Sequence, residues 1–264
     1  MLTEEQIRQD LTKLKDIVIA HKAPDAELAT HKEIIDGQEY DVFSKVPTNL
    51  GELYELGLQE GHQTFLVYQD ERYTFAESLD MAQRMARVLK ESYGISQGDR
   101  VAICARNSPE WCLAYMAISI LGAIIVPMNS WWKGAEIEYG LNDSGSKLAI
   151  VDQARFEQLK PYLGPLELDA IIIKPEKEEV YPEFYSLIEN VEPLSKEEIK
   201  ALNILPENDV SIMYTSGSTG MPKGVLSTHR GIINALYTWR FVKEINEILR
   251  PELVEENPEH QPAL

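Results

Sequence analysis

Cysteine is scarce in this sequence: Cys104 and Cys112 are the two among 264 residues. Both lie in apolar stretches, which is typical of buried free thiols in a reducing compartment. No histidine or third cysteine lies near them in sequence, so a metal site or a thiol nucleophile is the weaker interpretation. With 44% hydrophobic and 26% charged residues, the composition is that of an ordinary globular protein, and it excludes a disulfide-stapled scaffold.

Positive charge is also in short supply. Lysine and arginine number 25 against 43 aspartates and glutamates, which gives a formal net charge of −18. A nucleic acid or an anionic membrane needs a basic face to replace its counterions, so neither is an expected partner. A nucleotide ligand stays compatible with this balance, because phosphate is gripped locally by amides and one or two cations.

The N-terminus lacks both the apolar core of a signal peptide and the acid-poor character of a transit peptide, which predicts a cytoplasmic protein. Residues 111–132 carry no charge and are long enough for a membrane span. That stretch, however, contains Gly122, Pro127 and the β-branched residues 124–126. We therefore predict a buried helix, a glycine stop and a buried parallel strand there, and no transmembrane segment.

Alternating strands and helices fill the middle of the chain. Thr74 and Glu77 form a capping box that starts a helix with one apolar face. Strands are predicted at 100–105, 123–127, 147–151 and 169–173, and helices at 108–121, 134–141 and 155–162. Apolar strands that alternate with helices predict an α/β fold, an open and mostly parallel sheet flanked by helices on both faces.

The flanking parts are less regular. Helices are predicted at 4–21 and 50–61, a strand at 65–68, a turn at 69–72, strands at 210–215 and 223–228, and a helix at 230–249. A glutamate-rich connector with one short helix is predicted between Lys174 and Asp209. The predicted domains are an N-terminal extension (1–49), an N-terminal α/β subdomain (50–173), the acidic connector (174–209), and a hairpin, helix and start of an incomplete second subdomain (210–264).

One segment has residue types suited to binding a ligand: residues 211–231, SIMYTSGSTGMPKGVLSTHRG. Gly217 and Gly220 permit positive φ and let backbone amides converge on one point. Hydroxyl donors and one mobile cation surround them: Thr215, Ser216, Ser218, Thr219 and Lys223. Many fixed donors, no anion and one positive charge are what a polyphosphate requires.

This segment differs from the commoner phosphate loop. A Walker A motif counted from Gly217 requires glycine at Pro222 and serine or threonine at Gly224. Pro222 disfavours helical geometry before it, and Val225 continues as a strand, so a strand–loop–strand is predicted. A Gly/Ser/Thr run alone is most often a plain flexible loop. The complete string, with its Pro-Lys-Gly exit, favours the phosphate site.

The string YTSGSTGMPKGV, residues 214–225, resembles the signature of the AMP-binding (adenylate-forming) superfamily. Upstream, GDRVAI, NSPEW, GAIIVPMN and LNDSGSKLAIVD stand in the order of that family's N-terminal subdomain. The resemblance covers about residues 50–229 and is strongest to fatty-acid or medium-chain acyl-CoA ligases. Trp131 and Trp132 depart from it, because the family more often has a small or basic pair there.

The resemblance implies an ATP-dependent ligase that converts a carboxylic acid, here a fatty acid, to an acyl-adenylate and then to a thioester of coenzyme A. By the same resemblance, Thr215, Ser216, Gly217, Ser218, Thr219, Gly220 and Lys223 hold the β- and γ-phosphates, with Mg²⁺ shared. Their role is positioning and electrostatic stabilisation. No catalytic residue and no protein metal ligand is identified, and His229 is expected to be structural.

Family members are about twice as long as this chain, and the adenine-contacting, ribose-binding and C-terminal lysine motifs are absent from the sequence. Two hypotheses follow: an acyl-CoA ligase present as an inactive N-terminal fragment, or a non-catalytic nucleotide-binding or interaction module of the same fold. A P-loop NTPase is a distant third. The edge of an incomplete sheet is also expected to be a site of association.

Overall fold

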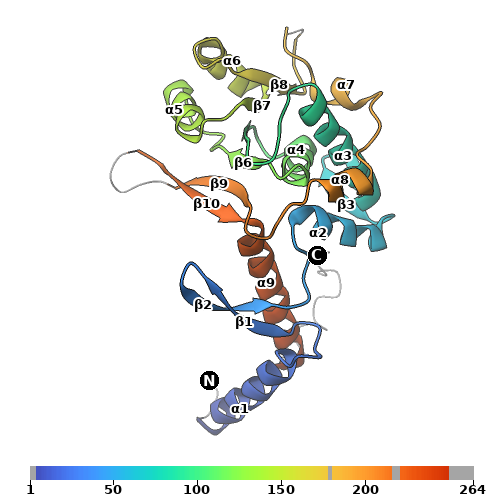
Figure 1. Ribbon diagram of the computed structural model, residues 1–264, viewed down its shortest axis with the longest axis vertical. Helices are drawn as coiled ribbons and strands as arrows, with labels where there is room; N and C mark the ends of the chain where they lie inside the picture. The colour runs from blue at the N-terminus through green and yellow to red at the C-terminus, as the bar shows by residue number, and fades with distance from the viewer. Residues whose placement is uncertain (1–3, 178–179, 216–220, 250–264) are drawn as a thin grey trace. The chain divides into compact units, whose positions relative to one another are not determined.

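The computed structural model describes residues 4–177, 180–215 and 221–249, with the backbone alone for residues 4, 6 and 7. The chain divides into two compact units. The larger one is Thr48–Arg230, and the smaller one combines the described parts of Met1–Pro47 and Gly231–Leu264 (Figure 1). The domain boundaries proposed after residues 49, 173 and 209 stay predictions.

The larger unit is built on a six-stranded sheet in the order β10-β9-β6-β5-β7-β8. All neighbouring strands pair in parallel except β9 and β10, which are antiparallel. This arrangement confirms the predicted open, mostly parallel sheet. Its strands are β5 (Arg100–Cys104), β6 (Ile124–Pro127), β7 (Leu148–Asp152), β8 (Asp169–Ile173), β9 (Asp209–Thr215) and β10 (Lys223–Thr228).

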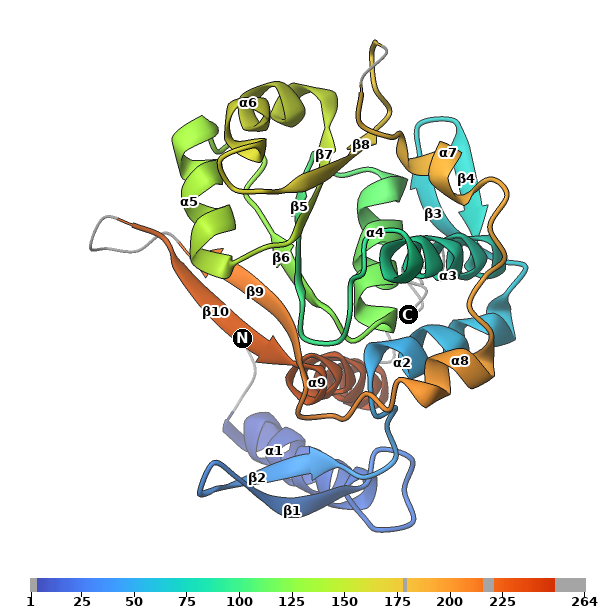
Figure 2. The same cartoon turned by 45° about the horizontal axis from the view of Figure 1, so that its top comes forward.

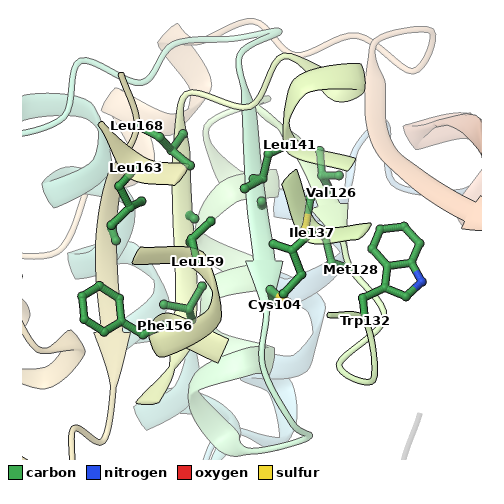
Figure 3. Packing of buried hydrophobic residues seen from close by; sticks show 14 of the residues in the cluster. Cys104, Val126, Met128, Trp132, Ile137, Leu141, Phe156, Leu159, Leu163 and Leu168 are labelled. Atoms are coloured by element: carbon green, nitrogen blue, oxygen red, sulfur yellow. The ribbon is translucent and has the colours of Figure 1, made fainter. Parts of the chain in front are cut away.

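Helices cover both faces of the sheet, because its parallel strands are apolar on both sides. Helices α3 (Phe75–Glu91) and α4 (Pro109–Ile120) lie on one face, and α5 (Gly134–Ser144) and α6 (Gln153–Leu163) on the other (Figure 2). A continuous apolar cluster fills the space under α5 and α6 (Figure 3). Each large side chain fully buried there stabilises the fold by about 1.5–3 kcal/mol.

The helix starts follow the capping residues of the sequence. Thr74 accepts a hydrogen bond from the Glu77 amide while the Glu77 carboxylate accepts from the Thr74 amide, so the predicted capping box is confirmed. Ser108 caps α4 ahead of a proline in its first turn. Asp152 caps α6 by accepting from the Arg155 amide at 3.0 Å. These contacts satisfy amides that have no partner inside the helix.

A buried carboxylate ties α4 to two strands. Glu110 is fully buried in the first turn of α4, where the helix dipole favours negative charge. The Lys174 ammonium, just beyond β8, lies 3.2 Å from Glu110 and 2.8 Å from Glu71 on β4 (Glu71–Thr74). Burial alone would lower the pKa of Lys174, but its hydrogen bond to Glu71 and its ion pair with Glu110 raise the pKa above the usual value.

Three local predictions need correction. The connector holds two short helices, α7 (Phe184–Ile188) and α8 (Lys196–Ala201), not one. Neither is long enough to show helical periodicity in the sequence. The predicted turn at 69–72 is confined to residues 69–70, and β4 then pairs with β3 (Thr64–Tyr68). The helix predicted over 50–61 is α2 (Leu50–Leu56) followed by a 3₁₀ turn, η1 (Gly57–Glu60).

The smaller unit contains α1 (Glu4–His21), the hairpin of β1 (Thr30–Ile35) and β2 (Gln38–Phe43), and α9 (His229–Leu249) after its first two residues. This hairpin is not predicted from the sequence, because its mostly exposed strands lack a clear apolar alternation. Its turn residues, Asp36 and Gly37, both have positive φ, as a two-residue hairpin turn demands. The Phe43 ring lies 5.9 Å from Tyr237 and 6.3 Å from Phe241.

Candidate functional site

The candidate site lies at the end of the β9–β10 hairpin. Strand β9 joins the sheet by pairing in parallel with β6, where Ser211 faces Ile125. The chain then returns antiparallel as β10, with Thr215 opposite Lys223 as the pair next to residues 216–220. The Thr215 hydroxyl donates to the Lys223 carbonyl at 3.4 Å. The two strands predicted on either side of residues 216–220 are therefore confirmed.

Of the seven residues predicted to grip phosphate, the structure brings two together. Thr215 and Lys223 are both exposed and face each other across the hairpin. Among the described residues, no ion pair engages the Lys223 ammonium. The other five lie outside the described residues: Ser216, Gly217, Ser218, Thr219 and Gly220.

The position that a Walker A motif would give to serine or threonine has a packing reason to be glycine. A Cβ atom added at Gly224 would come within 2.8 Å of Ile212 Cγ2. Tyr214 ring atoms would lie at 3.6 Å. Any side chain at Gly224 would thus displace its cross-strand neighbours, which supports the sequence argument against a P-loop NTPase.

His229, the first residue of α9, anchors the outgoing end of the hairpin. Its side chain is fully buried, and its Nδ1 accepts a hydrogen bond from the Leu50 amide at 3.1 Å. Burial lowers the pKa of this imidazole to about 4, so it is neutral near pH 7. Nδ1 is the acceptor, so the proton of the neutral ring resides on Nε2. This contact fits the structural role expected for His229.

Two residues of α5, Tyr139 and Asp143, contact the hairpin and were missed by the sequence analysis. The Tyr139 hydroxyl donates to the Pro222 carbonyl, 83 residues away in sequence. Asp143 accepts from the Tyr214 hydroxyl, 71 residues away. No local pattern could reveal these contacts, because they depend on how α5 packs beside the hairpin.

The two cysteines are free. Cys104 is buried and Cys112 half-buried, and burial raises the pKa of both thiols, to about 12 for Cys104. They are therefore neutral near pH 7 and poor nucleophiles. No group of three or more His, Cys, Asp or Glu side chains suited to a metal ion occurs within the described residues.

Comparison with protein families identifies the lineage. Residues 56–254 match the family described as AMP-binding enzyme. The chain belongs to the AMP-binding enzyme family. The resemblance drawn from residues 50–229 is confirmed.

Two curated proteins that are similar to this chain are CoA ligases. The long-chain-fatty-acid–CoA ligase FadD13 of Mycobacterium tuberculosis is 34% identical over 173 residues, which is 64% of this chain and 32% of the relative. 4-Coumarate–CoA ligase 2 of Oryza sativa subsp. japonica is 31% identical over 176 residues, or 62% of this chain and 30% of the relative. The chain thus spans about a third of the length of the curated relatives that it matches.

Solved structures of the family share the fold. The anthranilate CoA ligase AuaEII in complex with anthranoyl-AMP matches 69% of this chain and 35% of its own, with a TM-score of 0.61 and 28% identity. The N-terminal domain of FACL13 from Mycobacterium tuberculosis matches 69% of this chain and 45% of its own, with a TM-score of 0.58 and 28% identity.

The tryptophan pair that departs from the AMP-binding signature has two different environments. Trp131 is 71% exposed, and the Arg106 guanidinium lies 3.7 Å from its ring centroid. Trp132 is buried and meets Tyr214 edge-on. The uncharged stretch, residues 111–132, contains most of α4 and all of β6. None of the described helices has both the length and the apolarity that crossing a membrane requires.

Proposed function

We propose that this chain supplies the nucleotide-phosphate grip of an adenylate-forming ligase that activates a carboxylic acid and transfers it to coenzyme A. The observation that carries the proposal is the hairpin, which sets Thr215 opposite Lys223 with the glycine- and hydroxyl-rich residues 216–220 between them. Membership of the AMP-binding family and the CoA-ligase names of the relatives support the same conclusion.

In the proposed reaction, a carboxylate oxygen attacks the α-phosphorus of ATP. The bond to the oxygen that bridges to the β-phosphorus breaks, and pyrophosphate leaves. The thiolate of coenzyme A then attacks the acyl carbon and displaces AMP. Charge builds on the departing pyrophosphate, so fixed donors and a cation near its oxygens stabilise the transition state without moving a proton.

The residues fit these roles by chemistry. Lys223 supplies a mobile positive charge, and Thr215, its cross-strand partner in the hairpin, supplies a hydroxyl donor. We assign Ser216, Gly217, Ser218, Thr219 and Gly220 to the same grip from their sequence. Mg²⁺ would bind with the nucleotide through its phosphate oxygens, a mode that requires no cluster of protein ligands.

For the acid, we propose a fatty acid, with 4-coumarate as the comparison substrate. Similar proteins carry both names: one is a long-chain-fatty-acid–CoA ligase and another a 4-coumarate–CoA ligase. The 264-residue chain is expected to bind MgATP but not to complete the reaction, because its match covers about a third of the length of those relatives. A non-catalytic nucleotide-binding or interaction module of the same fold is the second candidate.

The test starts with MgATP binding, measured by calorimetry on the chain and on Lys223→Met. Loss of a hydrogen bond to a charged oxygen costs about 1.5–3 kcal/mol, so binding should weaken about 10- to 150-fold. The free energy of unfolding should change by less than about 0.5 kcal/mol, because the Lys223 side chain is exposed. Lys90→Met, which removes another exposed lysine, is the matched control for net charge.

Carboxylate-dependent exchange between ATP and pyrophosphate then separates the two candidates. The ligase hypothesis predicts exchange with a fatty acid or with 4-coumarate once the remaining length of a full ligase is joined to the chain. The chain alone should give none. Exchange by the chain alone would contradict its expected inactivity, and a chain that does not bind MgATP would overturn the phosphate grip itself.

A further inference from the structure

One helix holds both flanks of the segment at residues 216–220. On the outgoing side, the Tyr139 hydroxyl of α5 donates to the Pro222 carbonyl at 3.1 Å. On the incoming side, the Tyr214 hydroxyl donates to Asp143 Oδ2 of α5 at 2.6 Å and, over a longer distance of 3.3 Å, to the Gly140 carbonyl of the same helix. Tyr139 and Asp143 are four residues apart and share a helix face. The two bonds therefore tie both ends of the segment to one rigid element.

Aromatic packing surrounds these two bonds. The Tyr214 ring centroid lies 5.5 Å from that of Trp132 and 6.4 Å from that of Tyr139, and both pairs meet edge to face. Trp132 closes the end of the apolar cluster beside Met128 (Figure 3). Its approach to α5 depends on Gly140, where an added Cβ atom would lie 2.8 Å from Trp132 Cζ3. The packing of Trp132 against α5 therefore requires glycine at position 140.

The Tyr214 hydroxyl is a dependable donor in this setting. Burial, and then the hydrogen bond and charge of Asp143, raise its pKa above the usual value. The proton therefore stays on the oxygen throughout the physiological range. A hydrogen bond to a carboxylate is about twice as strong as one between neutral groups.

The hairpin needs such bonds because it has little burial of its own. Four of the six residues of β10 are exposed, from Lys223 to Leu226. It is an edge strand, so only β9 holds its backbone within the described sheet. Side-chain bonds to α5 reduce the number of arrangements open to the flanks, and preorganisation of this kind increases affinity without any new contact to the ligand.

We propose that Tyr139 and Tyr214 are positioning residues that fix the two arms of the β9–β10 hairpin on α5, so that Thr215 and Lys223 meet a triphosphate in a preset arrangement. This inference rests on the proposed function, since it takes MgATP as the ligand. Neither tyrosine touches the phosphates. Each acts through the backbone or the side chain to which it is bonded.

The test uses Tyr139→Phe, Tyr214→Phe and the double variant, which remove only hydroxyl groups. A hydrogen bond worth about 1 kcal/mol corresponds to roughly fivefold in affinity, so each variant should weaken MgATP binding about fivefold and the double variant about 25-fold. Tyr54→Phe is the matched control, because it removes a hydroxyl bonded to Ser119 at 3.1 Å, far in sequence from the hairpin. It should lower stability similarly and leave MgATP affinity unchanged.

Asp143 provides a rescue experiment. Asp143→Asn keeps an oxygen that accepts from Tyr214 and should retain most of the affinity. Asp143→Ala leaves Tyr214 with only the longer bond to the Gly140 carbonyl, so it should lose more affinity than Asp143→Asn and no more than Tyr214→Phe. Affinity losses in the tyrosine variants no larger than in Tyr54→Phe would overturn the inference. Equal losses in Asp143→Asn and Asp143→Ala would overturn the Tyr214 half of it.

Amide hydrogen exchange without nucleotide makes the inference independent of the proposed function. Exchange at residues 213–215 and 223–225 should be faster in Tyr139→Phe and Tyr214→Phe than in the wild type or in Tyr54→Phe. If the wild type binds no MgATP, the phosphate grip fails, yet faster exchange still supports the positioning role. Unchanged exchange in both tyrosine variants refutes it.

Discussion

The centre and one edge of the same sheet are held in different ways. In β5 and β7, all residues except one at an end of each strand are buried, and helices cover both faces. In β10, by contrast, four of six residues are exposed, and the hairpin depends on hydroxyl bonds to α5. Apolar burial stabilises the first region without requiring particular pairs of side chains to meet. The second region needs specific polar contacts, and the candidate site lies there because its donors must face solvent to meet a ligand.

The largest expected effect belongs to the buried region. Phe156 on α6 is fully buried in the apolar cluster. Phe156→Ala should lower the free energy of unfolding by about 3–5 kcal/mol, because it loses apolar burial and leaves a cavity. Urea titration followed by circular dichroism measures this. Phe156→Leu, which keeps most of the volume, should cost less than about 1.5 kcal/mol, and equal losses would show that cavity formation is not the cause.

His229 provides the next test, at the foot of the hairpin. Its pKa of about 4 in the folded state is below the ordinary value of 6.5, so the unfolded chain binds the proton more readily. Protonation of His229 therefore does not lower the free energy of unfolding above about pH 6.5, but lowers it progressively as the pH falls from 6.5 towards 4. The loss should reach about 3 kcal/mol at pH 4.

His229→Asn isolates this contribution, because its side-chain oxygen accepts from the Leu50 amide in place of Nδ1 and does not titrate. The wild type should lose about 3 kcal/mol more than this variant between pH 7 and pH 4 in urea unfolding. Removal of an exposed imidazole, in His62→Asn, should leave the wild-type pH profile in place. Parallel profiles for the wild type and His229→Asn would contradict the assignment.

A smaller effect is expected where the two regions meet. Gly140→Ala places a Cβ atom 2.8 Å from Trp132 and 3.1 Å from Met128. Overpacking costs about 1–3 kcal/mol, but alanine regains about 1 kcal/mol of helix propensity, so a net loss of roughly 1 kcal/mol is expected. Gly164→Ala, with no atom within 4 Å of its added Cβ, is the control for thermal unfolding. A gain in stability at Gly140 would show that Trp132 moves freely.

The smallest effect is expected on the exposed face of the hairpin. Val225 is 49% exposed on β10. Val225→Thr keeps the β-branched shape and should change the free energy of unfolding by less than about 0.5 kcal/mol in urea titration. A loss approaching that of Phe156→Ala would mean that burial stabilises the hairpin as well, and the contrast between the two regions would fail.

The sequence predicted elements whose signals are local. Thr74 and Glu77, Ser108 with Pro109, and the apolar runs of β5 and β7 each carry their own cap or period. The elements that the sequence did not predict, the β1–β2 hairpin and one of the two short connector helices, have weak local signals. Polar strands flank the Asp36–Gly37 turn, although that pair is itself a hairpin signal. The helices α7 and α8 are shorter than the window in which periodicity is recognised.

By itself, the sequence determined the fold class, the family and the strand–loop–strand form of the candidate site, since glycine, proline and hydroxyl residues act on the backbone next to them. Tertiary structure alone decided that Tyr139 and Asp143 bond to the flanks of the site, that Gly224 has no room for a side chain, and that His229 is buried against Leu50. The physical reason is that these contacts join residues about 10 to 180 positions apart. Their geometry exists only after the two strands of the hairpin have paired and the helices have packed.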